Sequence, residues 1–170
     1  MAESTVVRTK RDGVITISDS AGSHSYVVAY EPGDFNFDVP LNATSHYLDR
    51  GEIGTTPSVR KGDDAPVTLG FSAYWRDLSD VAGSPTYATL ADICIRFTSD
   101  YVTSNWTSTL GTNSDEFAVT VALAIEGSAY GGADQTLSFP YVVLRMSGAE
   151  GDPNTLTASG TSYALRPTIA

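Results

Sequence analysis

The fold class of this chain is decided by one stretch, Val67-Thr68-Leu69-Gly70-Phe71-Ser72-Ala73-Tyr74-Trp75. Every second side chain from Val67 to Trp75 is apolar, and the positions between them are Thr, Gly, Ser and Tyr. Successive side chains of a β-strand point to opposite faces of the sheet, so this alternation predicts a strand with one face in the core. We expect Trp75 to belong to that core face and Tyr74 to lie on the outer face.

The same period of two recurs along the chain. Residues 117–125 alternate over a comparable length, which places Ala118 on the outer face. Residues 34–39 alternate with Asp34 and Asp38 on the polar face. Further strands are predicted at 14–18, 24–30, 135–146 and 156–166, the first two joined by a short turn that contains glycine. Pro140 lacks an N–H group, so it predicts a bulge or an edge position in its strand.

One segment has a helical period instead. Leu90, Ile93, Cys94 and Phe97 are spaced as one face of a helix, and Pro85 suits its first turn. The sequence therefore predicts a single, mainly β domain over 1–170. We expect a β-sandwich or half-barrel of about six to eight strands, one packed helix at 85–97 and an N-terminal arm at 1–12.

Residues 41–65 form a long polar connection with charges of both signs and no sustained periodicity. Connections of this length with no structure of their own are uncommon inside a compact domain, and they are usually functional. We expect a loop here that contacts a partner.

Composition excludes several classes of protein. Hydrophobic residues make up 41% of the chain and charged residues 18%, which argues against disorder. The net charge of −10 leaves no basic cluster with which to hold nucleic acid. The sequence contains no apolar run long enough for a membrane helix, its first residues do not resemble a secretory signal, and Cys94 is the only cysteine. We therefore expect no membrane insertion and no disulfide framework.

The sequence offers no recognisable catalytic, cofactor or metal motif. A nucleophile elbow and a phosphate-binding glycine loop are absent, and neither His24 nor His46 lies in a catalytic sequence context. The spacing of His46, Asp49 and Glu52 permits a metal site, but a solvated polar loop is the favoured interpretation. The prediction is a protein that is not an enzyme and has no cofactor.

The predicted outer faces of the strands at 67–75 and 117–125 carry almost no charge. Free sheet edges are normally protected by charged residues, so uncharged faces favour a sheet that something else covers, such as another copy of the chain. Tyr74 and Trp106 are candidate contacts between subunits, and Trp106 has the alternative role of closing the core.

The order of these parts resembles the tail tube (major tail) proteins of long-tailed bacteriophages and, more distantly, the tube proteins of contractile tails and type VI secretion. The shared order is a hairpin at 14–30, the polar loop, the strand at 66–75, the helix and the strand at 116–126. The resemblance implies a subunit of stacked hexameric rings that form a hollow tube with an acidic lumen for DNA.

The resemblance also implies roles for individual residues. Lumen candidates are Asp34, Asp38 and, more weakly, Glu126, for which an ordinary solvated strand face is the alternative. The long loop would contact a neighbouring subunit or ring through residues of both charges: Asp49, Arg50, Glu52, Arg60, Lys61, Asp63 and Asp64.

The sequence thus predicts a structural protein of the virion tail that assembles with itself in the host cytoplasm. Expected partners are tape-measure, tail terminator and tail tip proteins, and double-stranded DNA passes through without specific binding. The alternatives are a tail terminator or head–tail connector subunit that closes a single ring, and a separate β-sandwich module that binds carbohydrate.

Overall fold

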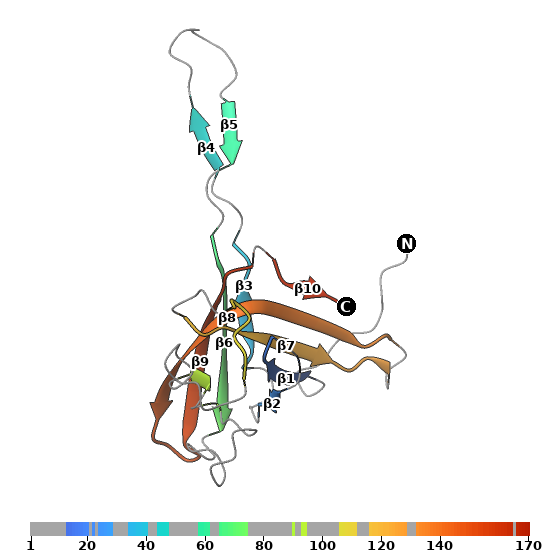
Figure 1. Ribbon diagram of the computed structural model, residues 1–170, viewed down its shortest axis with the longest axis vertical. Helices are drawn as coiled ribbons and strands as arrows, with labels where there is room; N and C mark the ends of the chain where they lie inside the picture. The colour runs from blue at the N-terminus through green and yellow to red at the C-terminus, as the bar shows by residue number, and fades with distance from the viewer. Residues whose placement is uncertain are drawn as a thin grey trace.

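The computed structural model describes residues 13–20, 22, 24–28, 34–40, 44–47, 58–61, 65–74, 90, 93–94, 106–111, 116–128, 132–164 and 166–170, with only the backbone in 44–47 and 58–61. The strands are β1 (Gly13–Ser18), β2 (Ser25–Val27), β3 (Asn36–Asp38), β4 (Thr44–Tyr47), β5 (Ser58–Lys61), β6 (Val67–Tyr74), β7 (Val119–Ile125), β8 (Gln135–Ala149), β9 (Thr155–Ser162) and β10 (Thr168–Ile169). The predicted mainly β fold is confirmed (Figure 1).

Eight strands form one antiparallel sheet in the order β2-β1-β7-β8-β9-β6-β3, and β10 pairs with β8 outside this path. The sheet is not closed into a barrel, because β2 and β3 end the path without pairing with each other. The predicted hairpin near the N-terminus is the pair β1–β2, in which Thr16 lies opposite Val27.

Strand β8 is shared by two halves of the sheet. Its first part, 135–139, pairs with β7 and β10, and its second part, 142–149, pairs along its length with β9. Between them, Pro140 and Tyr141 form the predicted bulge: the register against β7 shifts, and Tyr141 has a φ of 55°. Figure 1 shows β8 curving at this region, which brings the two halves of the sheet together around a common core.

Side chains from both halves meet in that core. The alternation predicted for 67–75 is confirmed over β6, because Val67, Leu69, Phe71 and Ala73 are all buried. Phe139 of β8 is fully buried and its ring lies 5.9 Å from that of Phe35. The same core includes Ile15, Ile17, Val119, Val121, Val142, Leu144, Leu156 and Ala158.

The long connection differs from the prediction. Within 41–65, strands β4 and β5 pair antiparallel as a separate two-stranded sheet, with Thr44 opposite Lys61 and Tyr47 opposite Ser58. Figure 1 shows this hairpin, hereafter the arm, beyond the end of the main sheet. Backbone pairing alone defines it, and strands that stand away from a core need no alternating apolar pattern. The expectation of a loop without structure of its own was therefore wrong.

Two further predictions concern the part near the helix. Leu90, Ile93 and Cys94 have helical backbone, and Leu90 and Ile93 are buried as the apolar stripe requires; the other residues of 85–97, like Trp75 and 1–12, lie outside the described residues. Ala118 was expected on an outer face but is fully buried. The segment 106–111 covers it, since the Ala118 N–H donates to Ser108 Oγ at 3.1 Å and its carbonyl accepts the Thr109 N–H at 2.9 Å.

Candidate functional site

One half of the main sheet contains no charged residue. This half, hereafter the neutral sheet, comprises β1, β2, β7, β10 and residues 135–139 of β8. The pairing registers align one row across all five strands: Val27, Thr16, Ala122, Ser138 and Thr168. A broad surface of small neutral side chains is unusual on a chain with a net charge of −10, and it permits close approach of another protein surface.

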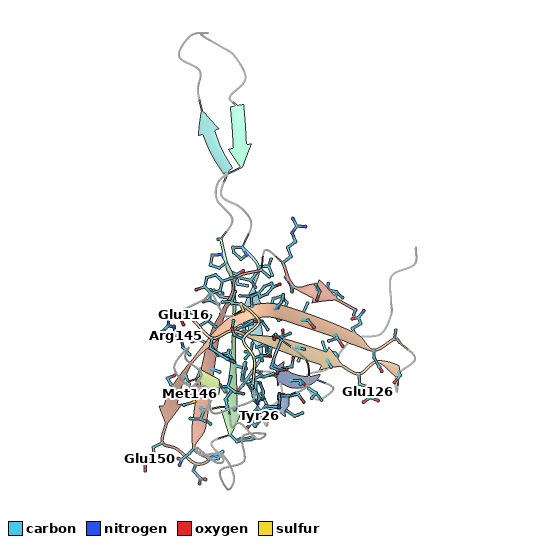
Figure 2. All side chains as sticks on the ribbon, viewed as in Figure 1. Tyr26, Glu116, Glu126, Arg145, Met146 and Glu150 are labelled. Atoms are coloured by element: carbon cyan, nitrogen blue, oxygen red, sulfur yellow. The ribbon has the colours of Figure 1, made fainter. Side chains whose placement is uncertain are left out.

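The other half of the sheet has an outer face of hydroxyl groups. Thr68 lies opposite Thr161, and Ser72 lies opposite Thr157. Arg145 of β8 is the charged residue on this face of β6, β8 and β9, and its guanidinium is 3.9 Å from a carboxylate oxygen of Glu116. Figure 2 shows these two side chains next to each other at the surface. Both are exposed, so the ion pair adds little stability.

The sheet has edges at which a further strand could be added. Strand β3 pairs with residues 68–70 of β6, so among the described residues the side of β6 from Phe71 to Tyr74 has no strand on it. Phe37 of β3 is 48% exposed although its ring lies 5.4 Å from that of Phe139, because the strand is the last on its side. Strand β2 ends the other side with Val27 exposed.

The structure does not bring the three predicted lumen residues together. Asp34 and Asp38 lie at β3, at one end of the strand order, with Asp34 half-buried and Asp38 exposed. Glu126 is exposed just after β7, in the other half of the sheet (Figure 2). In a single subunit these carboxylates therefore belong to two separate regions.

Most of the predicted loop residues fall beyond what the structure describes. Arg60 and Lys61 belong to β5 of the arm, where Arg60 lies opposite Ser45. The remaining candidates lie outside the described residues: Asp49, Arg50, Glu52, Asp63 and Asp64.

The two aromatic candidates have different surroundings. Tyr74 is half-buried at the end of β6, next to the open side of that strand. Trp106 is only 6% exposed, belongs to the core and stacks on His24 with 6.0 Å between ring centroids. The structure thus shows the role of closing the core for Trp106, and little of its surface is available to a neighbouring subunit.

A buried polar cluster fastens the β1–β2 turn, and the sequence did not reveal it. The carboxylate of Asp19 accepts hydrogen bonds from the His24 backbone N–H at 3.3 Å and from Thr107 Oγ1 at 3.2 Å, and the His24 ring lies 3.2 Å away. Burial alone would raise the pKa of Asp19, but the hydrogen bonds from His24 and Thr107 outweigh it and lower that pKa below its ordinary value. No local signal predicts this contact, because Thr107 is far from Asp19 along the chain.

Among the described residues, no three His, Cys, Asp or Glu side chains gather closely enough to hold a metal ion. Burial raises the pKa of the Cys94 thiol to about 12, as expected for a cysteine on the apolar stripe of a helix. No helix in the described portion of the chain has the length and apolar character needed to cross a membrane.

Comparison with known proteins identifies the fold. No family model matches the sequence, and no curated protein matches it. A chain in the cryo-EM structure of the PVC sheath/tube terminator of an extracellular contractile injection system, in its extended state, superimposes with a TM-score of 0.57 at 10% identity, covering 100% of this chain and 98% of that chain. The fold is similar to that of a contractile injection system component.

Two further structures agree. A chain of the anti-feeding prophage baseplate matches with a TM-score of 0.53 at 9% identity, covering 100% of this chain and 97% of that one. A chain of the anti-feeding prophage tube-terminating cap matches with a TM-score of 0.52 at 13% identity, with coverages of 100% and 94%. The neighbours are structural parts of tail-like particles, and the resemblance to tail-structure proteins is confirmed at the level of fold.

Proposed function

We propose that this protein is a structural, non-enzymatic subunit of a phage tail or a phage-like injection particle, and that it assembles into rings that stack into a tube. The observation that carries the proposal is the match of fold over the full length of the chain to components of contractile injection systems. The neutral sheet supports it, because it offers identical chains a surface on which to meet.

Charge makes such a surface necessary. Each chain carries a net charge of −10, so identical copies repel wherever their acidic surfaces come within a Debye length, about 8 Å at physiological salt. Contact is therefore favoured where charge is absent, and the neutral sheet is such a region. We assign the ring contacts to the edges of the neutral sheet.

The same acidity suits a channel for DNA. A wall with carboxylates and no basic cluster gives phosphate groups nothing to bind, so DNA slides without being held. We propose Asp34 and Asp38 as channel-facing residues and Glu126 as a weaker third, each contributed repeatedly around the ring. Partners would be tape-measure, tail terminator and tail tip proteins in a particle assembled in the host cytoplasm.

A second candidate function is a tail terminator that closes one ring at the end of a tube. Two of the matching structures favour it, since one is a sheath/tube terminator and the other is a tube-terminating cap. The two functions differ in one property: a tube subunit adds rings without limit, whereas a terminator stops at one ring.

Electron microscopy of the purified protein at increasing concentration tests both functions. Tubes with a central hole indicate the tube subunit, single rings indicate the terminator, and a strictly monomeric chain at every concentration contradicts both. The last result would favour the carbohydrate-binding alternative, which glycan binding would then test.

Removal of the arm tests how rings stack. We expect a variant in which a short Gly-Ser linker replaces residues 45–63 to fold, because β4 and β5 form a sheet separate from the main one. Tube growth should stop in this variant. A matched control is Glu150→Gln, an exposed residue at the far end of the body from the arm, which should leave growth unchanged (Figure 2). Normal tubes from the variant without the arm would refute the assignment.

A further inference from the structure

The strand β10 covers one side of β8 with few contacts. Thr168 pairs with Ser138 and Ile169 with Leu137. Beyond the strand, the Ala170 N–H donates to the Thr136 carbonyl at 3.0 Å, and the Thr136 N–H donates to the Ala170 carbonyl at 2.8 Å. These backbone hydrogen bonds complete the ladder of β8 over the first part of that strand.

Side chains add little to this attachment. Ile169 is 76% exposed, the highest value among the large hydrophobic side chains that the structure describes, and Thr168 and Ala170 are exposed as well. Apolar burial is the main source of stability for a strand on a sheet, and solvent-exposed backbone hydrogen bonds contribute far less. The pairing of β10 is therefore weak enough to be exchanged.

The edge beneath β10 is firmly held. Residues 135–139 are paired with β7 on their other side, and Phe139 is fully buried in the core. Pro140, which has no N–H, ends this edge, and the bulge at Tyr141 turns the rest of β8 away. Without β10, the N–H and C=O groups of Thr136 and Ser138, which point away from β7, would form a rigid, preformed template for an added strand.

We propose that the edge of β8 from Gln135 to Phe139 is a docking site for a strand of a second copy of this chain, and that β10 is a displaceable cover which blocks it in the free subunit. The proposal rests on the proposed function, because it assigns one contact between subunits of the ring and says that β10 blocks this contact before assembly. A second copy is the occupant that the charges favour: the strands around this edge contain no charged residue, and the neighbouring acidic residues Asp134 and Glu126 lie at one end, beyond Gln135 and Ile125. Two chains of net charge −10 can therefore meet along these strands with few like charges brought together. A very short strand on an edge is also a common protection against premature pairing.

A disulfide that locks β10 in place tests the proposal within one molecule. Ser138→Cys combined with Thr168→Cys places the two thiols on directly paired residues, whose expected Cα separation of about 5.5 Å suits a disulfide. The native Cys94 is unreactive because burial raises its pKa to about 12. We expect the oxidised protein to remain monomeric in sedimentation velocity, and the same sample to assemble after reduction. Equal assembly of the oxidised and reduced forms overturns the proposal.

A variant that ends at Pro167 removes the cover. We expect it to assemble at a concentration roughly ten-fold lower than the parent chain does, since the cost of displacing β10 is gone. Ile169→Ser is the matched control: it changes an exposed side chain, keeps the backbone pairing and should assemble as the parent does.

The outcomes separate this proposal from the function on which it rests. If the parent and the variant without β10 form rings at the same concentration, the cover is refuted and the proposed function stands. If every variant, including the one without β10, stays monomeric at all concentrations, both are refuted.

Discussion

The close packing around Gly160 predicts a specific effect of substitution on stability. It lies in β9 between Leu69 of β6 and Leu144 of β8. A Cβ atom placed on Gly160 would lie 2.7 Å from Val142 Cγ1 and within 3.1 Å of both leucine side chains. All three neighbours are buried and cannot move aside, so we expect Gly160→Ala to lower the free energy of unfolding by about 1–3 kcal/mol, as overpacking does elsewhere.

The same substitution in the neighbouring strand is the control. A Cβ on Gly70 of β6 would lie 3.2 Å from Asn36 Oδ1, the end of an exposed side chain that can rotate away. We expect Gly70→Ala to change the free energy of unfolding by less than about 0.5 kcal/mol. Urea unfolding followed by circular dichroism measures both variants.

A second substitution checks the cause of the effect. Val142→Ala removes the methyl group that would collide with the new Cβ, and by itself it costs about 2 kcal/mol for the lost buried groups. The double variant with Gly160→Ala should cost at least about 1 kcal/mol less than the sum of the two single changes. Equal stability of Gly160→Ala and Gly70→Ala would refute the packing described for this row.

Three further predictions concern charged residues. Asp19→Asn should lower the free energy of unfolding at pH 7 by about 1–3 kcal/mol, because the His24 and Thr107 groups lose a buried charged acceptor. The pKa of Asp19 is lower in the folded chain than in the unfolded chain. This stabilisation is therefore present above the unfolded pKa and is lost as the pH falls through the folded pKa. Denaturant titrations from pH 7 to pH 2 should show the unfolding free energy of the parent converging on that of the variant. Replacing Asp34 and Asp38 by Asn should leave assembly intact and slow DNA passage, and an unchanged ejection rate would remove both residues from the channel. Arg145→Ala should change the unfolding free energy by less than about 0.5 kcal/mol, since both it and its acidic partner are exposed; a larger loss would show that the ion pair matters.

The strands of the main sheet were predictable because each long one has one face in the core. The alternation in β6 identified Val67, Leu69 and Phe71 as core residues. The lack of an N–H at Pro140 predicted a bulge or an edge position, and the structure has the bulge. Both signals are local: the first reflects the two-residue period of a strand and the second a missing donor.

Neither the arm nor the burial of Ala118 was predictable in this way. Strands β4 and β5 are defined by their pairing with each other in a separate sheet, which leaves no period in the sequence. The alternating pattern placed Ala118 on the outer face of its strand. In the structure the segment 106–111 packs over it and is held by hydrogen bonds of Ser108 and Thr109. An alternating pattern shows which face a side chain takes and does not show what else packs on that face.

The candidate assembly surface was predictable only in part. An uncharged outer face was evident in the strand at 117–125, yet its union with the neighbouring strands into one neutral sheet depends on the registers that align Thr16, Ala122 and Ser138, and the uncharged face at 67–75 belongs to the other half of the sheet. The position of β10 on β8 has no counterpart in the sequence, because two residues are too few to carry a pattern.

The amino-acid sequence by itself determined that this protein is mainly β, that its strands bury alternate side chains and that it carries a strong excess of acid, since each of these follows from neighbouring residues or from composition. Only the tertiary structure decided which strands lie side by side, where β8 bends, which edges stay open and which carboxylates stand apart. These features depend on backbone pairing between distant segments. Because backbone N–H and C=O groups are nearly the same at every residue, the sequence does not specify directly which strands pair with each other.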